Sequence, residues 1–316
     1  MTRCSGRRVT EGRASGNHTH APVVDSARSM NTTRSADTQG PPFEDPRKVL
    51  SRHGLHPKRS FSQNFLVSQH AVDSIAKAVG QRDGQLVVEL GPGLGTLTAA
   101  LLREGARVIG VERDRDMLAV LRADFAQYAT ARFVDGDAAD LALSPLLDEP
   151  SQQIVVAGNL PYSVTGSILR GLIDQRASIS RAVIMVQKEV GDRLLADANT
   201  RAYGALSVFV QAVFDVFSVL DVPPGAFHPP PKVSSAVIEL RKRAVPRAEE
   251  TETFRKVVRG AFEQRRKTLR NALISAFDDA AKIDAALAAA GIDGKRRGET
   301  LTVEEFRTLG ESVAGV

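Results

Sequence analysis

The feature of this sequence that most constrains its fold is a regular alternation of apolar and amphipathic segments between residues 71 and 190. Apolar runs predict buried strands at residues 85–90, 107–112, 131–138, 152–159 and 181–190. Apolar residues at helical spacing lie before and between the first three runs, at residues 71–80, 96–105 and 115–126. Strands that alternate with helices form a mostly parallel sheet covered on both faces. The pattern therefore predicts an α/β fold.

The pattern changes toward both ends of the chain. Residues 213–222 and 234–242 predict two strands without a long helix between them, which indicates an antiparallel pair at the sheet edge. Later apolar residues have helical spacing only, in three segments at 252–277, 281–291 and 302–313. The first 45 residues are polar and lack apolar periodicity. We expect a disordered tail (1–45), an α/β domain (46–246) and a small all-α domain (247–316).

Composition excludes several kinds of site. The single cysteine, Cys4, cannot form a disulfide within the chain, which suits a reducing cytoplasm. The six histidines form no spaced cluster with cysteine, so no metal site is expected. No apolar run approaches the ~20 residues that a membrane-spanning helix needs. The net charge of +5 is compatible with a nucleic-acid partner.

A glycine-rich stretch, "ELGPGLGTLT", follows the first predicted strand. Gly91, Gly93 and Gly95 stand between a strand and a helix, where glycine lets the backbone approach a ligand closely. Thr96 occupies the place of the last glycine in the dinucleotide fingerprint. This departure favours a single nucleoside over a dinucleotide, although a structural turn would also explain the glycines. The acid before the loop, Glu89, suits a cationic ligand better than a phosphate.

Acids also end the next two predicted strands. Glu112 lies about where an acid binds ribose hydroxyls in nucleotide-binding folds, and Asp137 ends the following strand. With "NLPY" (residues 159–162), these motifs resemble a class I S-adenosylmethionine-dependent methyltransferase, and the NLPY form resembles enzymes that methylate the exocyclic amine of adenine. The chain is further similar to the ribosomal RNA adenine dimethyltransferase family, specifically its small-subunit members, in "FSQNFL", "QKEV", "FHPPPKVSSAV" and "QRRKTLRN".

The resemblance extends from Lys58 to about Leu309 and has consequences for fold and activity. It implies a Rossmann-like, mostly parallel seven-stranded sheet with an antiparallel edge, and a small all-α C-terminal domain. It also implies an enzyme that transfers methyl groups from S-adenosylmethionine to the N6 amines of two adjacent adenines in a small-subunit (16S) rRNA hairpin. The partner would be rRNA within an assembling ribosomal subunit, and the enzyme would be a cytoplasmic monomer.

The resemblance also implies which residues hold the cofactor. Its methionyl end would lie against the FSQNFL motif and the glycine loop, its ribose against an acid, and its adenine against a second acid and a backbone N–H. The residues so assigned are Asn64, Leu66, Gly91 and Asn159 for the methionyl end, Glu112 for the ribose, and Asp137 and Ala138 for the adenine.

The NLPY motif then has a chemical interpretation beside the plain one of a turn. The amine of adenine is a poor nucleophile because its lone pair is delocalised into the ring. The Asn159 side chain and the Leu160 backbone each offer a C=O group, and together they could hold both N–H groups and turn the lone pair toward the methyl group. Tyr162 could stack on the target base, with Phe227 on its other face; each could instead be a core aromatic.

Basic residues suggest where RNA binds. Arg265, Arg266, Lys267 and Arg270 form what we call the basic cluster, and Lys58 and Arg59 form a second patch. Phosphate contact is the functional interpretation, and a solvated helix face is the structural one. Ser62 stands where small-subunit enzymes usually have glycine, and serine there resembles large-subunit (23S) enzymes that confer macrolide resistance. Such an enzyme, or a non-catalytic RNA-binding assembly factor, remains an alternative.

Overall fold

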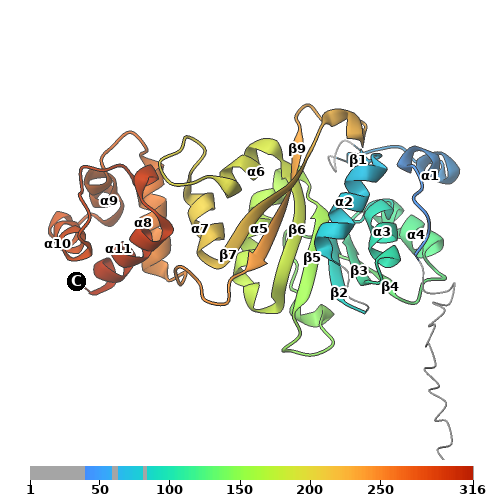
Figure 1. Cartoon of the computed structure of the whole chain (residues 1–316), viewed down its shortest axis with the longest axis horizontal. Coiled ribbons are helices and arrows are strands. Elements are labelled where there is room, and N and C mark those ends of the chain that lie inside the picture. The colour runs from blue at the N-terminus through green and yellow to red at the C-terminus, as the bar shows by residue number, and fades with distance from the viewer. Residues whose placement is uncertain (1–39, 59–62, 81–83, 316) are drawn as a thin grey trace, which may run out of the picture. The chain divides into compact units, whose positions relative to one another are not determined.

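The computed structural model describes residues 40–58, 63–80 and 84–315, and it contains the predicted sheet (Figure 1). Five strands run parallel: β2 (Leu86–Leu90), β3 (Arg107–Glu112), β4 (Ala131–Asp135), β5 (Ile154–Asn159) and β6 (Ile179–Gln187). Two more, β7 (Phe214–Val222) and β9 (Ser235–Lys242), complete a seven-stranded sheet in the order β4-β3-β2-β5-β6-β9-β7. Since β9 is antiparallel to both β6 and β7, the predicted antiparallel edge is confirmed.

Alternate residues of the central strands enter different hydrophobic layers. In β2, Val87 packs with the helices α2 (Gln69–Val79), α3 (Thr96–Arg103) and α4 (Arg115–Asp124). Val88 belongs to the other layer, together with α5 (Thr165–Asp174), α6 (Lys188–Leu195) and α7 (Ala205–Val213). Successive side chains of a strand point to opposite faces, so an apolar residue at every position is what a sheet covered on both faces requires.

Shorter elements complete this part of the chain. The helix α1 (Pro46–His53) begins at Asp45, whose side chain accepts a hydrogen bond from the Arg47 N–H. A two-stranded antiparallel ladder joins β1 (Phe65–Leu66) to β8 (Phe227–His228) and so brings distant segments together. Short 3-10 helices occupy Ser144–Leu146, Tyr162–Val164, Arg176–Ser178, Pro224–Ala226 and Gly298–Thr300.

The C-terminal region is helical, as predicted, but its first segment is broken. Residues 252–277 form two helices, α8 (Glu252–Glu263) and α9 (Leu269–Phe277), followed by α10 (Ala280–Ala290) and α11 (Val303–Gly315). Thr268 caps α9 by accepting a hydrogen bond from the Asn271 N–H. At the start of α9, the N–H groups of Leu269 and Arg270 have no partner within the helix. They donate instead to the carbonyls of Arg296 and Gly294.

The C-terminal helices share a hydrophobic core with the sheet. Phe254 of α8 packs its ring edge-on against Phe209 of α7, with the ring centroids 6.2 Å apart, and Phe262 packs likewise on Tyr203. The same layer of buried residues includes Ile184 of β6. The boundary at residue 247 therefore divides elements that pack together, and the predicted division into domains stays a prediction.

Truncation of Phe254 tests this shared core. The side chain is 2% exposed, so Phe254→Ala should lower the free energy of unfolding by about 3–5 kcal/mol. Because the core is continuous, calorimetry should record one unfolding transition in both proteins. The control Phe217→Ala, at a ring that is 41% exposed, should cost less than about 1 kcal/mol. Two separate transitions, with only one shifted by Phe254→Ala, would contradict a common core.

Candidate active site

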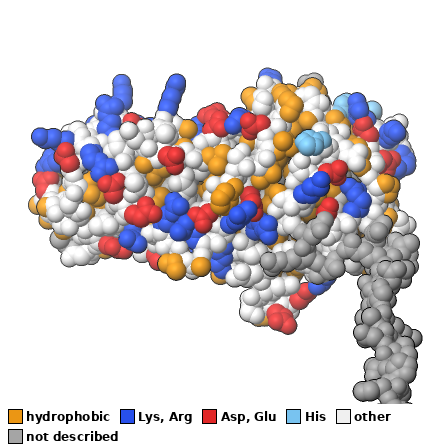
Figure 2. Space-filling view, viewed as in Figure 1, with side chains coloured by type: hydrophobic (Ala, Val, Ile, Leu, Met, Phe, Trp, Pro, Cys, Tyr) orange, Lys and Arg blue, Asp and Glu red, His pale blue; other side chains and the backbone are white. Residues whose placement is uncertain are grey.

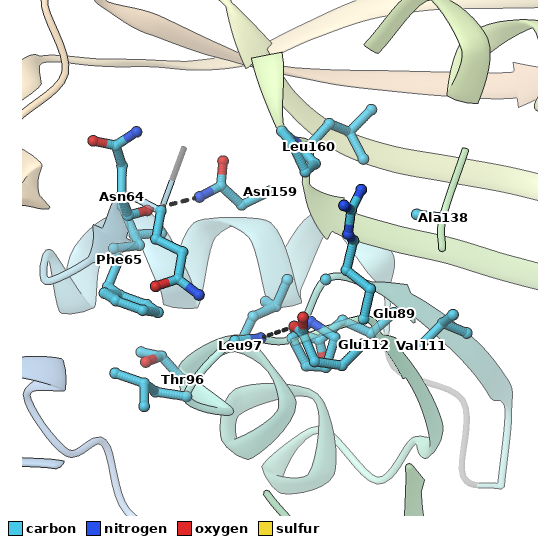
Figure 3. A pocket seen from close by; sticks show the side chains of 18 of the residues that line it. Asn64, Phe65, Glu89, Thr96, Leu97, Val111, Glu112, Ala138, Asn159 and Leu160 are labelled. Carbon is cyan, nitrogen blue, oxygen red and sulfur yellow. Dashed lines mark hydrogen bonds between the residues drawn. The ribbon is translucent and has the colours of Figure 1, made fainter. Parts of the chain in front are cut away.

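A cavity opens at the carboxyl ends of β2, β3 and β5, which parallel pairing brings to one edge of the sheet (Figure 3). Such an edge is where α/β folds bind ligands. The β1 segment closes one side of it. All seven predicted cofactor residues line the cavity, together with two of the predicted catalytic residues beyond Asn159: Asn64, Leu66, Gly91, Glu112, Asp137, Ala138, Asn159, Leu160 and Tyr162.

The glycine loop places open backbone beside the cavity. Gly91 has φ +66°, and a Cβ added there would meet no atom within 4 Å. At Gly95, by contrast, the same Cβ would lie 2.4 Å from the Phe125 ring. Gly95 therefore serves the packing of the loop on α4, whereas Gly91 leaves room for a ligand to touch the backbone.

Glu112 is buried at the end of β3, and its carboxylate is oriented by the backbone. Its Oε2 accepts from the Gly93 N–H at 3.0 Å, and its Oε1 accepts from the Asp114 N–H at 2.9 Å. Burial raises the pKa of Glu112, although these hydrogen bonds act in the opposite direction. Each carboxylate oxygen can accept a second hydrogen bond, so both could receive ligand hydroxyl groups.

Glu89 lies on the neighbouring strand and is 1% exposed. Its Oε2 accepts a hydrogen bond from the Thr98 hydroxyl at 2.5 Å. Burial raises the pKa of Glu89 to about 7, and repulsion from Glu112 acts in the same direction, against the Thr98 bond. A cation bound in the cavity would favour the ionised form of this carboxyl.

Asp137 lies two residues beyond the end of β4, not at its last residue as the sequence suggested. Its Oδ2 forms an ion pair with Arg113 at 2.7 Å, and its Oδ1 accepts from the Ala139 N–H at 3.0 Å. Ala138 lies beside it on the cavity wall.

The side-chain amide of Asn159 is oriented by one hydrogen bond. Its Nδ2 donates to the Asn64 carbonyl oxygen at 3.1 Å (Figure 3). The Oδ1 atom is thus the end of the amide left to accept a bond from a ligand. Leu160 donates its N–H to the Met185 carbonyl at 3.0 Å, and in the described parts of the chain no hydrogen bond to its own carbonyl oxygen is found. Two consecutive residues that line the cavity thus each carry a carbonyl oxygen that can accept a hydrogen bond.

The two predicted stacking aromatics differ in position. Tyr162 lines the cavity, and its hydroxyl shares a 2.9 Å hydrogen bond with the hydroxyl of Ser235, which is fully buried in β9. Phe227 is 4% exposed, is paired with Leu66 in the short ladder and packs among buried residues of the α2 layer. It does not line the cavity, so its role on the target base stays a prediction without support from the geometry.

The predicted RNA-binding residues are not equivalent. Arg265 pairs with Glu299 at 3.2 Å, Arg270 pairs with Asp284 at 2.5 Å, and Lys58 pairs with Asp114 at 2.7 Å. Arg266 and Lys267 are exposed and have no ion pair with any described residue. Figure 2 shows Lys and Arg side chains interspersed with Asp and Glu over the C-terminal helices. Arg59, like Ser62, lies outside the described residues.

In the described ranges, no three His, Cys, Asp or Glu side chains are grouped so that they could hold a metal ion. None of the helices that the structure describes is both long and apolar enough to cross a membrane.

Sequence reasoning missed the contacts that fix this site. Gln63 and Asp114 hydrogen-bond each other at 2.7 Å, and Ser235 holds Tyr162, yet none of the three was a candidate. One of these residues could have been identified from the sequence. Asp114 stands directly before a helical segment, where an aspartate often caps the helix.

Comparisons with known proteins show the family to which the chain is similar. A family model described as ribosomal RNA adenine dimethylase matches residues 54–314. A ribosomal RNA small subunit methyltransferase A from Anaeromyxobacter sp. (strain K) is 47% identical over 280 residues, which cover 85% of this chain and 99% of the relative. The protein of the same name from Myxococcus xanthus (strain DK1622) is 46% identical over 84% of this chain and 94% of its own length.

Two solved structures share the fold. A dimethyladenosine transferase from Plasmodium falciparum superposes with a TM-score of 0.65 at 24% identity, over 78% of this chain and 95% of that one. The 23S rRNA methyltransferase ErmE superposes with a TM-score of 0.60 at 26% identity, over 79% of this chain and 100% of that one. The class I methyltransferase fold predicted from the sequence is confirmed.

Glu89 should make stability depend on pH. Its pKa of about 7 lies above the ordinary value of 4.5, so the folded protein binds more protons than the unfolded chain between these values. Its contribution to stability is present at pH 4.5 and is lost as the pH rises through 7, by up to roughly 3 kcal/mol. Glu89→Gln should remove this loss, as measured by urea unfolding at pH 5 and pH 8. The exposed control Glu149→Gln should behave like the parent; an equal loss in Glu89→Gln would contradict the assignment.

Proposed function

This chain belongs to the ribosomal RNA adenine dimethylase family, and we propose that it dimethylates the N6 amines of two adjacent adenines in a small-subunit (16S) rRNA hairpin. It is an S-adenosylmethionine-dependent rRNA methyltransferase, since the family and the fold agree on this chemistry. The observation that carries the proposal is the orientation of Asn159, whose Nδ2 is bound by Asn64 and whose Oδ1 is left for the target amine.

The cavity fits the cofactor. Glu112 offers buried carboxylate oxygens to the ribose hydroxyls, and Gly91 has open space above its Cα where a methionyl group would lie. Asn64 and Leu66 would bound that group from β1, and Asp137 and the Ala138 N–H would meet the adenine. When bound, S-adenosylmethionine supplies an electrophilic methyl group on a sulfonium centre. The nearby Glu89, if ionised by that positive charge, would stabilise it.

Asn159 and Leu160 would orient the target amine. Their two carbonyl oxygens can each accept one N–H of the adenine amine, which would reduce the delocalisation of its lone pair into the ring and turn the lone pair toward the methyl group. As the amine gains positive charge during the reaction, both oxygens bind it more strongly than before, which lowers the barrier. No general base is needed in this step, because the neutral amine itself attacks. The new N–C bond would replace the methyl–sulfur bond, and the methylated amine would then lose a proton to water. Tyr162, anchored by Ser235, would stack on the base and limit its tilt.

RNA binding is the part of the proposal that rests on surface charge. Arg266 and Lys267 are the members of the basic cluster best placed to contact phosphates, because their charges are not engaged by carboxylates of the described chain. Arg265 and Arg270 would first have to exchange an existing ion pair. We also propose that the enzyme acts as a monomer, in the cytoplasm, on rRNA within an assembling small subunit.

The large-subunit alternative is less well supported. The structure of ErmE is similar at 26% identity, but relatives named as small-subunit enzymes reach 47% over almost their whole length. A non-catalytic role would not require Glu112, Asn159 and Tyr162 to be held as they are. Methylation assays with purified small and large subunits separate these alternatives.

Asn159→Ala should lower the rate of methyl transfer by about 10²–10³, as loss of one oriented transition-state partner does elsewhere. RNA affinity should barely change, because the phosphate contacts lie on other elements. Single-turnover methylation of under-methylated small subunits measures the rate. Near-normal turnover in a folded variant would mean that Asn-Leu-Pro-Tyr is a turn without a catalytic role.

Removing the Tyr162 hydroxyl tests how this ring is held. Tyr162→Phe keeps the stacking surface but breaks the bond to Ser235, so the rate should fall by about 3–10-fold, the scale of one neutral hydrogen bond. Tyr128→Phe is the matched control, because Tyr128 packs on Phe125 away from the cavity and should leave the rate unchanged. Equal rates in the parent and Tyr162→Phe would show that the anchor is dispensable.

The basic cluster can be divided by paired substitutions. Replacing Arg266 and Lys267 with Ala should reduce the salt dependence of RNA binding by roughly one log–log unit per lost phosphate contact, without loss of stability. Replacing Arg265 and Arg270 should instead remove ion pairs and lower stability modestly. Binding to a small-subunit RNA fragment at several salt concentrations gives the slopes. An unaltered slope in the Arg266 and Lys267 variant would make this surface a solvated helix face.

A further inference from the structure

Asp114, two residues beyond Glu112, is 1% exposed, and both oxygens of its carboxylate accept hydrogen bonds. Its Oδ1 accepts from the Asp116 N–H at 3.0 Å and from the Lys58 ammonium at 2.7 Å. Its Oδ2 accepts from the Gln63 side-chain amide at 2.7 Å. The first of these bonds caps α4, but the other two tie the carboxylate to a segment about fifty residues earlier.

The same few residues reach both halves of the active site. Through its backbone N–H, Asp114 donates to Glu112, the proposed ribose ligand, at 2.9 Å. Gln63 accepts from the Lys58 N–H at 2.8 Å, which fixes its side chain toward Asp114. Gln63 is followed directly by Asn64, whose carbonyl binds Asn159 at 3.1 Å. A continuous path of hydrogen bonds and one peptide bond thus connects Glu112 to Asn159.

Lys58 is the only charge that compensates Asp114 in this path among the residues described. A buried carboxylate without a partner is costly, and the loss of one member of a buried pair leaves that cost uncompensated. Bonds from Lys58, Asp116 and Gln63 hold the pKa of Asp114 below its ordinary value, although burial acts in the opposite direction. Lys58 also pairs with Asp116 at 2.6 Å, so its ammonium already has two carboxylate partners.

We propose that Lys58 and Asp114 are a positioning pair for methyl transfer. The pair holds Gln63 and Asn64 against the turn from Glu112 to Asp114 and so sets the position of Asn159 in the active site. The inference rests on the proposed function and deepens it. It also gives Lys58 a different role from the phosphate contact expected from the sequence, because a phosphate would have to displace Asp114 and Asp116 from the ammonium.

The test uses the full chain and four substitutions. Lys58→Met removes the charge at similar length, Lys58→Arg restores a cation, and Asp114→Asn keeps a residue that can cap α4. The matched control is Lys77→Met, which removes one exposed lysine from α2 without touching this path. Three quantities are measured: the Kd for S-adenosylmethionine by calorimetry, the single-turnover rate at saturating cofactor, and the salt dependence of RNA binding.

The pair predicts a specific pattern. Lys58→Met and Asp114→Asn should each weaken cofactor binding about 10-fold and slow single turnover about 3–10-fold, and the double variant should be no worse than the more affected single one. Lys58→Arg should recover part of both losses. For Lys58→Met and Asp114→Asn, the salt dependence of RNA binding should match that of the control Lys77→Met. The control should also keep the cofactor Kd and the single-turnover rate of the parent. If the pair were purely structural, its substitution would lower thermal stability and leave the cofactor Kd and the single-turnover rate of the folded protein unchanged.

Other outcomes would overturn the proposal. If Lys58→Met reduces the salt slope by about one unit with an unchanged cofactor Kd, Lys58 is a phosphate contact. Additive losses in the double variant would show that the two residues act independently. Failure of the parent itself to bind S-adenosylmethionine would refute the proposed function and this pair together, whereas a parent that binds it, with variants that bind equally well, would refute the pair alone.

Discussion

The parallel pairing of β2 with both β3 and β5 is the constraint on which the rest of this structure depends. It brings Leu90, Glu112 and Asn159 to one edge of the sheet although they are separated by up to 69 residues along the chain. The glycine loop, the proposed ribose ligand Glu112 and the proposed catalytic amide of Asn159 thus become neighbours in space. The short ladder between β1 and β8 then adds Asn64 and Leu66 from the N-terminal side.

This arrangement concentrates buried acids in a small volume. Glu89, Glu112 and Asp114 are all at most 7% exposed. Burial raises the pKa of the first two, while Lys58 and two N–H donors lower the pKa of the third. Negative charge beside the cavity suits a cationic cofactor better than a phosphate, which agrees with the absence of the last glycine of the dinucleotide fingerprint at Thr96.

Local sequence patterns were sufficient for the strands of the sheet, because runs of apolar residues mark where these strands lie. The candidate residues that line the cavity were assigned mainly from the resemblance to a known family. Local patterns were insufficient wherever the partner lies far along the chain. The spacing of apolar residues predicts one helix over residues 252–277. A new helix begins at Leu269 instead, where the carbonyls of Arg296 and Gly294 accept its first N–H groups, and no local sequence pattern indicates these distant partners. Likewise, the sequence indicates Lys58, Arg265 and Arg270 as candidate phosphate contacts. In the structure they form ion pairs with Asp114, Glu299 and Asp284, respectively, which lie far along the chain or in another element. The sequence leaves open whether Phe227 stacks on the target base or packs in the core. In the structure its side chain is only 4% exposed.

The Asn159 amide, oriented by Asn64, is the group that we propose to align the target adenines of small-subunit RNA for methylation. The most direct measurement is mass mapping of ribosomal RNA from a strain that lacks the gene, complemented with either the parent or Asn159→Ala. Two adjacent adenines of small-subunit RNA should lose both N6 methyl groups on deletion, regain them with the parent, and remain largely unmethylated with the variant. Unchanged small-subunit RNA with a lost methyl group in large-subunit RNA, or full restoration by the variant, would contradict the proposal.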